Sequence, residues 1–491
     1  MVSINENPDF SASLALAHEF YFRGDLNQAI EALNEVIDKN WMTASEEGNR
    51  HPRAGGDPGI KNFHPIYAAL GLLYFKKENF PLAEEAFIKA LSIQPDDFNS
   101  MYNLALCYEK QSKLKDAVAC LLAMIEADPF FAKPYFFLAK LLLKGKNNEK
   151  SEYYFNELSQ RFPNDIGILS KIISILIDYD QYEIARKYSA QLLKAHQENH
   201  EFFYNAGVIE EKLKNIDQAI LLYKKSLDIL PDYFPALNNL GVLSLLKQEV
   251  GEAKSYFKKA LEVEPNNESV EYTLSALTGV KSKVKAPEDY VAKLFDAYAD
   301  HFDEHLQLSL DYCVPKLLYE ACKPFLKKDL VVLDLGCGTG LTIQPFLSHA
   351  KRTVGVDLSE KMLIEAKKKN CYFELYKNSL IDFLSTVKEK FDLVLAGDVL
   401  VYTGNLEALF KCLFRKIKPE GLFSFSIEVN QKESFLLKPS GRFAHSKNYI
   451  KALAEEFQFE ILVEKEAVTR SQFNEPVSGM IYVLKEVGHQ V

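Results

Sequence analysis

Three glycines and one acid at the end of a predicted strand are the residues of this chain best suited to binding chemistry. Residues 331–335 place apolar and β-branched side chains around Asp334, which predicts a buried parallel strand. The strand is followed by small residues before helix-forming sequence resumes, namely Gly336, Cys337, Gly338 and Gly340. A Cβ at such a turn would block a sharp bend and keep a ligand away from the backbone. The turn therefore predicts a site for a nucleotide-like cofactor.

The acid inside the strand indicates which nucleotide the turn suits. A dinucleotide site has the spacing G-x-G-x-x-G and places a pyrophosphate at a helix N-terminus. The spacing here is G-x-G-x-G, and Asp334 would repel a pyrophosphate but attract a sulfonium and an ammonium group. An enzyme that uses a nicotinamide cofactor is therefore disfavoured.

A second predicted strand, 352–357, ends in an acid about twenty residues beyond the first glycines. A carboxylate at that distance is placed to accept both hydroxyl groups of a ribose, and Asp357 is this candidate. Ser359 is expected to cap the helix that follows.

The glycine turn resembles the first motif of the class I S-adenosylmethionine-dependent methyltransferases, in the letters VLDLGCGTG at 332–340. The resemblance implies an α/β Rossmann-like domain of seven strands with S-adenosyl-L-methionine as cofactor. Relatives carry an acid that reaches the adenine amino group where LYKNSLIDF has Ser379, and a serine makes a weaker hydrogen bond. The cofactor-binding residues expected from the turn and the resemblance are Asp334, Gly336, Cys337, Gly338, Gly340, Asp357, Leu358, Ser379 and Leu380.

Few catalytic groups are required for methyl transfer, because positioning supplies much of the acceleration and a base is needed only for a protonated acceptor. Asp398 and Tyr402 follow the fourth predicted strand, where such folds place acceptor groups. Either is a candidate for orienting an acceptor amine or hydroxyl, and the alternative is a structural role as helix cap and core edge. Glu428, at the end of the fifth predicted strand, is the third candidate.

The family pattern RFAHS, followed by Tyr449, contributes the fourth catalytic candidate, His445. A histidine on a loop at the carboxyl end of a sheet is suited to act as a general base. The alternative is that Ser446 caps the next helix and His445 is merely exposed. Arg442, in the same pattern, is a candidate for holding an anionic group of the substrate.

Strands and helices alternate beyond the glycine turn as they do in a doubly wound sheet. The third, fourth and fifth strands are expected at 371–377, 391–397 and 421–428. Two further strands, 457–466 and 477–485, are expected to form the antiparallel hairpin that closes a methyltransferase sheet.

An amphipathic helix is predicted before the first strand, in the letters YVAKLFDAYADHFDEHL at 290–306. It resembles the lead-in helix of methyltransferases that bacteria fuse to helical repeats, and that resemblance implies a cover near the cofactor. Tyr290, Tyr298 and Phe302 are its available aromatic residues. The alternative is a helix that only packs on the core.

A period of 34 residues organises the first half of the chain, as the prolines at 95, 129, 163, 231 and 265 indicate. Its units resemble the tetratricopeptide repeat, for example AALGLLYFKKENFPLAEEAFIKALSIQP at 68–95. Small residues recur in both helices of a unit and would let the helices approach closely. Six units are expected at 64–267, a degenerate seventh at 10–40 and a closing helix at 266–277.

The concave face of such a solenoid suits an extended partner. Asn103, Asn205 and Asn239 share one place in three repeats, where an amide can donate to and accept from a peptide backbone, as in the similar repeats of O-GlcNAc transferases. The alternative is that they only line the groove. A loop at 42–63 contains RHPRAGGDPG, which resembles the translated palindromic repeats inserted in some bacterial genes and is expected to have no binding role.

Composition limits the class of protein. A net charge of −10 and a pI of 5.6 argue against nucleic acid as partner. The N-terminus has no signal-peptide pattern, and no apolar stretch reaches the roughly 18 residues of a membrane span. Seven scattered cysteines without C-x-x-C favour reduced thiols over a metal site and predict a cytoplasmic protein.

Length and pattern predict three regions. These are a repeat solenoid at 1–280, a linker at 281–289 and a methyltransferase domain at 290–491. The predicted function is methyl transfer from S-adenosyl-L-methionine to a protein or peptide that the concave face of the solenoid recruits or presents. The alternatives are a repeat scaffold with a weak or inactive methyltransferase domain, which Ser379 favours, and a small-molecule methyltransferase that uses its repeats for assembly.

Overall fold

The computed structural model describes residues 8–46, 63–280, 283–304, 306, 312–472 and 475–488. Their contacts divide the chain into two compact units, Met1–Ile229 and Leu230–Val491. The last helical repeat and the helix that closes it thus share a unit with the β-sheet, and the predicted domain boundaries stay a prediction. Among the described residues, no helix combines the length and apolarity that crossing a membrane requires.

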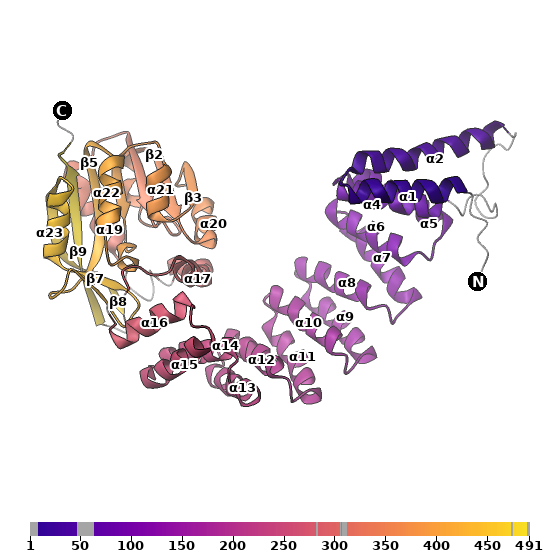
Figure 1. The fold of residues 1–491 in the computed structure, drawn as a ribbon, viewed down its shortest axis with the longest axis horizontal. Helices are drawn as coiled ribbons and strands as arrows, with labels where there is room; N and C mark the ends of the chain where they lie inside the picture. The colour runs from indigo at the N-terminus through magenta and orange to yellow at the C-terminus, as the bar shows by residue number, and fades with distance from the viewer. Residues whose placement is uncertain are drawn as a thin grey trace. The chain divides into compact units, whose positions relative to one another are not determined.

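Antiparallel helix pairs make up the first unit (Figure 1). The predicted loop begins inside its second helix, which runs to Glu46, and residues 47–62 of that loop lie outside the described residues. Three more helices of the same repeat pattern begin the second unit, namely α14 (Phe234–Leu246), α15 (Val250–Val263) and α16 (Glu268–Thr278). The helices of the first unit are α1 (Pro8–Phe22), α2 (Leu26–Glu46), α4 (His64–Lys76), α5 (Phe80–Ile93), α6 (Phe98–Lys110), α7 (Leu114–Ala127), α8 (Ala132–Lys144), α9 (Asn148–Arg161), α10 (Ile166–Asp178), α11 (Tyr182–Ala195), α12 (His200–Lys212) and α13 (Ile216–Ile229).

One turn geometry recurs in the six full repeats. The residue between the two helices of each repeat has a left-handed backbone, with φ between 56° and 65°, although none of the six is glycine. The following residue closes the turn by donating its N–H to a carbonyl of the first helix, as Asn79 does to Tyr74 at 2.9 Å. The six left-handed residues are Glu78, Ser112, Lys146, Asp180, Lys214 and Gln248.

Complementary side-chain sizes let the two helices of a repeat approach closely. A Cβ on Gly71 would lie 2.6 Å from the ring of Phe87, sixteen residues later in the partner helix. Gly207 and Gly241 face the rings of Tyr223 and Phe257 at the same separation and the same distance. The missing Cβ is therefore filled by an aromatic ring, which explains the small residues of the repeat pattern.

The sheet of the second unit has nine strands in the order β3-β2-β1-β4-β5-β7-β6, with β9 beside β5 and β8 beside β9. β1 to β5 are parallel, and β8 and β9 form the predicted antiparallel hairpin against β5. The strands are β1 (Leu330–Leu335), β2 (Ala350–Asp357), β3 (Glu374–Lys377), β4 (Phe391–Ala396), β5 (Ile417–Val429), β6 (Phe435–Leu437), β7 (Phe443–His445), β8 (Phe459–Gln472) and β9 (Glu475–Glu486).

Two strands, β6 and β7, were not predicted, so the sheet has nine strands instead of the expected seven. The pairing of β5 with β4 ends at Phe425, which leaves the last residues of β5 open on that side. β7 takes this free edge, because Glu428 pairs with Ala444 in parallel while its other edge is already paired with β9. An open edge of backbone donors and acceptors is thereby covered.

The segment directly after the glycine turn was predicted to begin an α-helix, and the structure differs from this prediction. Residues Gln344–His349 form the 3₁₀ helix η4 instead of an α-helix. Pro345, at its second position, lacks an N–H group, and Thr342 and Ile343 before it are β-branched, so the segment is a poor α-helix former.

Both faces of the sheet are covered by helices. Leu333 and Leu335 of β1 pack toward α21 (Leu380–Thr386), α22 (Glu407–Lys416) and α23 (Lys447–Glu456), whereas Leu330 and Val332 pack toward α19 (Val314–Cys322) and η4. β1 is therefore buried on both faces, as its apolar sequence predicts.

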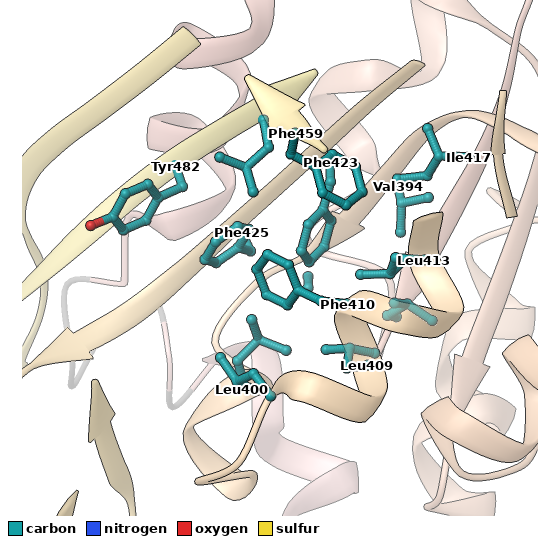
Figure 2. Close-up of a cluster of buried hydrophobic side chains, with 14 of the residues drawn as sticks. Val394, Leu400, Leu409, Phe410, Leu413, Ile417, Phe423, Phe425, Phe459 and Tyr482 are labelled. Atoms are coloured by element: carbon teal, nitrogen blue, oxygen red, sulfur yellow. The ribbon is translucent and has the colours of Figure 1, made fainter. Parts of the chain in front are cut away.

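An aromatic cluster anchors α22 to the sheet (Figure 2). The ring of Phe410 meets those of Phe423, Phe425 and Phe459 edge to face, at centroid distances of 5.8, 6.1 and 6.1 Å. Edge-to-face pairs add about 0.5–1.5 kcal/mol each to the burial of the rings. This cluster fixes β4 and β5, whose ends carry polar side chains.

Filling the gap left by Gly71 tests the packing of the repeats. Gly71→Ala is expected to lower the urea midpoint of the first unit, because overpacking costs about 1–3 kcal/mol and the helix-propensity gain is at most about 1 kcal/mol. Adding Phe87→Leu is expected to restore it, since Ala105 and Leu121 occupy these places in the next repeat. Gly145→Ala, also in the first unit and with a Cβ no closer than 3.5 Å to the atoms around it, is the matched control, and an equal drop there would contradict the packing argument.

Candidate active site

The glycine turn at the end of β1 requires glycine for two separate reasons. Gly336, Gly338 and Gly340 all have left-handed backbones, with φ of 66°, 52° and 88°. A Cβ on Gly336 would also lie 2.3 Å from Val399, and one on Gly340 would lie 2.9 Å from the sulfur of Cys371. The turn is therefore fixed by both conformation and packing.

Asp334 lies under this turn and is fully buried. Its Oδ2 accepts a hydrogen bond from the hydroxyl of Tyr372 at 2.6 Å, and its Oδ1 has no partner among the described residues. Burial raises the pKa of Asp334 to about 7, against the lowering effect of the Tyr372 hydroxyl, and the charge of Asp357 raises it further. A carboxylate in this state favours a cationic ligand.

Asp357, at the end of β2, joins the turn to the next helix. Its Oδ2 accepts the N–H of Gly338 at 2.8 Å and its Oδ1 accepts the N–H of Ser359 at 2.9 Å. Burial raises the pKa of Asp357, and the N–H groups that it accepts lower it. Ser359 caps α20 (Glu360–Lys368) as predicted, since its hydroxyl accepts the N–H of Met362 at 3.1 Å.

One cavity of about 330 Å³ collects most of the predicted site residues. Four predicted residues, Asp334, Gly340, Glu428 and His445, are not in its lining. Those that line it are Gly336, Cys337, Gly338, Asp357, Leu358, Ser379, Leu380, Asp398 and Tyr402. The candidates for cofactor and acceptor binding therefore meet in the same space.

Ser379 lines the cavity but its hydroxyl also serves the backbone. It caps α21 by accepting the N–H of Asp382 at 3.3 Å. An N-cap serine keeps a free lone pair and a hydrogen that can rotate, so it can still meet a ligand at the rim.

The predicted lead-in helix covers part of the cavity. α17 (Glu288–Tyr298) has no buried residue, yet Val291 and Phe295 line the cavity, as does Phe302 of the short helix α18 (Phe302–Glu304). Phe302 lies over the glycine turn, because a Cβ on Gly338 would lie 3.8 Å from its ring. The segment lines the cavity, as expected of a cover, and it also packs on α20 of the domain, as expected of an amphipathic helix.

Two aspartates hold this covering segment to the domain. Asp296 accepts a hydrogen bond from the hydroxyl of Ser359 and one from the N–H of Lys361. Asp303 accepts a hydrogen bond from the hydroxyl of Thr339 in the glycine turn and forms an ion pair with Lys369. The cover is thus attached by polar contacts next to the residues that shape the turn.

A network of charges forms another part of the cavity wall. Arg442 donates to Glu428 through Nε at 2.7 Å, to Tyr402 through Nη1 at 3.3 Å and to Asp398 through Nη2. Arg470 donates to Asp398 at 3.4 Å and to Glu428 at 2.8 Å. Asp398 is itself in the left-handed region, with φ of 57°, which is uncommon for a non-glycine residue and typical of functional sites.

Glu428 is a poor base in this network. Burial opposes its ionisation, but Arg442, Lys438 and Arg470 hold its pKa at about 2. It is 2% exposed, and Lys438 donates to its second oxygen at 2.9 Å. Glu428 does not line the cavity and contacts it only through the two arginines, and its part in catalysis stays a prediction.

The structure gives His445 a different place from the predicted loop. Its ring is fully buried in β7, and its Nε2 faces the carbonyl oxygens of Thr403 and Gly404 at 2.9 and 3.0 Å, so Nε2 must carry the hydrogen. Burial lowers its pKa to about 4. The prediction of a general base finds no support in this geometry, whereas Ser446 does cap α23.

Arg470 and Tyr312 are among the cavity residues that sequence reasoning missed. Arg470 lies between the two predicted strands of the hairpin, and Tyr312 lies between the lead-in helix and the first strand. Arg470 has the polar neighbours Thr469 and Ser471, so nothing local marks it as buried. No local signal marks Tyr312.

Comparison with known proteins agrees with this arrangement. The sequence matches the family described as a methyltransferase domain over residues 333–423, and families described as tetratricopeptide repeats over 68–132, 176–234 and 234–267. The chain contains tetratricopeptide repeats and a methyltransferase domain. The predicted fusion of a repeat solenoid with an S-adenosylmethionine-dependent methyltransferase domain is confirmed.

Three relatives that are named as methyltransferases each match less than a third of the chain. A malonyl-[acyl-carrier protein] O-methyltransferase of Priestia megaterium is 30% identical over 141 residues, 28% of this chain and 47% of that protein. A ribosomal protein L11 methyltransferase of Aquifex aeolicus is 36% identical over 114 residues, 22% of this chain and 44% of that protein. A ubiquinone biosynthesis O-methyltransferase of Bartonella tribocorum is 29% identical over 98 residues, which are 19% of this chain and 39% of that protein. The chain spans about half the length of these relatives or less.

Replacing Asp334 tests how much its buried charge lowers the free energy of unfolding. Because the pKa of Asp334 is raised from 3.8 to about 7, the folded protein binds an extra proton between these pH values, and its free energy of unfolding falls as pH rises through this window. Asp334→Asn cannot ionise and is expected to stabilise the cofactor-free protein by a few kcal/mol, on the order of the shift, at pH 8 and by much less at pH 4.5. Calorimetric unfolding at both pH values measures this, with the exposed Asp329→Asn as control. A gain independent of pH would contradict the assignment.

Proposed function

We propose that this protein transfers the methyl group of S-adenosyl-L-methionine to an acceptor that its repeats recruit or present. The observation that carries the proposal is Asp334, a buried carboxylate with one oxygen lacking a partner among the described residues, directly under a turn that only glycine fits. Such a group stabilises a cation far better than a phosphate.

The residues of the cavity fit the parts of this cofactor. Asp334 lies beneath the glycine turn and outside the cavity lining, so it would favour the cationic amino-acid end of the cofactor by its charge from below the turn. Asp357 would accept the ribose hydroxyls with the lone pairs that remain beside its two backbone partners. Leu358, Ser379 and Leu380 would flank the adenine. When bound, the cofactor supplies an electrophilic methyl group on a sulfonium.

The protein's own contribution is then binding and orientation. Glu428 is locked between arginines and His445 is buried outside the cavity lining, so neither is placed to remove a proton. Asp398 and Tyr402 do line the cavity and are the groups that would orient the acceptor. Positioning of this kind supplies much of the acceleration in methyl transfer.

A groove beside the cavity supports an acceptor presented by the repeats. It has a volume of about 790 Å³ and is lined by residues of α14, α16 and α17. Lys285 and Glu288 line both the groove and the cavity, so the two lie next to each other. Asn238 lines the groove instead of the predicted Asn239.

The acceptor that fits this groove best is a protein or peptide segment. Two of the relatives are named for acceptors carried on proteins, while the relative named for ubiquinone biosynthesis favours a small molecule. A groove that lies between a repeat and the cavity has room for a chain that extends beyond the methylated group. The seven free cysteines support a cytoplasmic location.

A repeat scaffold with an inactive domain is the second candidate. It is favoured by Ser379, whose hydroxyl is engaged in capping α21, and by Phe302, which lies over the glycine turn. Under this alternative the cavity does not take up the cofactor.

Calorimetry with S-adenosyl-L-methionine separates the two candidates. The wild-type protein is expected to release or absorb heat on binding, and Asp357→Ala is expected to weaken binding by at least about a hundredfold, because two hydrogen bonds to a charged group are lost. Glu360→Ala, which removes an exposed acid three residues away, is the control. No heat from wild type at millimolar cofactor would remove the enzyme hypothesis, and unchanged affinity of Asp357→Ala would show that the ribose contact is misplaced.

A further inference from the structure

Arg442 and Arg470 are two buried cations that line the same cavity as the glycine turn. Their side chains are only 14% and 7% exposed. Arginines this deeply buried are rare unless they are paired or bind a ligand. They come from different elements, the segment just before β7 and the last residues of β8, so their approach is a product of the fold.

Glu428 orients both guanidinium groups from outside the cavity. Its Oε1 accepts from Nε of Arg442 at 2.7 Å and from Nη2 of Arg470 at 2.8 Å, and it does not line the cavity. Lys438 compensates its second oxygen at 2.9 Å. Glu428 is therefore a positioning residue that holds the two arginines at fixed angles.

The arginine pair keeps donors for a further anion. Two guanidinium groups carry about ten N–H groups in total, and their bonds to Glu428, Asp398 and Tyr402 use five. Counting Lys438, three cations meet two carboxylates, so the network carries one excess positive charge. A planar carboxylate matches the fork of a guanidinium with two parallel bonds.

We propose that the methyl acceptor carries a carboxylate group, which Arg442 and Arg470 bind inside the cavity. This inference rests on the proposed function and names the chemical class of its substrate. The carboxylate of Asp398 accepts hydrogen bonds from both arginines, which shows that the two guanidinium groups are close enough together to bind one carboxylate. The carboxylate would fix the acceptor on the part of the wall that Tyr402 shares, beside the space for the cofactor.

Small carboxylates test this subsite in the full-length protein loaded with S-adenosyl-L-methionine. Succinate at constant ionic strength is expected to raise the unfolding temperature of the second unit by about 3 °C at tenfold saturation. The neutral isostere succinamide and the inorganic anion phosphate are expected to have little effect. Arg442→Gln and Arg470→Gln are expected to weaken the succinate response at least about tenfold while calorimetric affinity for the cofactor stays within threefold of wild type.

Arg352→Gln is the matched control, because Arg352 lies on β2, pairs with Glu374 and does not line the cavity. Its succinate response is expected to equal that of wild type. If the glutamine variants fail to fold because Glu428 loses its partners, Arg470→Lys keeps the charge with fewer donors and is expected to show an intermediate response.

The outcomes separate this inference from the proposed function. A wild-type protein that binds cofactor but responds to succinate no more than to succinamide overturns the inference and leaves the function standing. A response to phosphate alone, or an unchanged succinate response in the Arg442 and Arg470 variants, also overturns it. A protein that binds no cofactor fails the proposed function itself, and the inference falls with it.

Discussion

The methyltransferase domain depends on one carboxylate that the fold keeps away from water. Asp334 sits inside a strand that is buried on both faces, and among the described residues only the hydroxyl of Tyr372 forms a hydrogen bond with its side chain. Burial of an acid with one oxygen unpaired opposes folding unless the acid stays protonated or a cation arrives. The rest of the site is arranged around that condition, since the glycine turn leaves the backbone above it bare and Asp357 ties the turn to the next strand.

The acids in the other part of the cavity wall differ from Asp334 because they are paired with cations. There, Glu428 and Asp398 are each bonded to two arginines, so their burial is offset by ion pairs instead of by a ligand. Buried ion pairs fix geometry more reliably than they stabilise a fold. The buried acid under the glycine turn thus lacks a positive partner, whereas the arginine network in the cavity wall is already paired and carries one excess positive charge.

The two helices of a repeat pack closely because small side chains in one helix face large side chains in the other. In three of the six full repeats a glycine of the first helix faces an aromatic ring of the second, and every full repeat turns through one left-handed residue. The turn geometry is therefore kept although the sequence changes. The last repeat belongs to the unit that contains the sheet, where Tyr272 of α16 donates to the carbonyl of Gly441, next to Arg442. A helix of the repeat pattern thereby contacts the loop that carries a cavity arginine.

Local sequence determined the elements whose cause is local. The 34-residue period, the strand with its glycine turn and the acid at the end of β2 each follow from a few neighbouring residues, because periodicity and the steric freedom of glycine act over short distances. Tertiary structure decided the rest. Arg470 meets Glu428 across 42 residues, His445 turned inward because two carbonyl groups needed a donor, and β7 formed because β4 ended short of the edge of β5. Burial and pairing of this kind depend on which distant segments meet, and no short stretch of sequence contains that information.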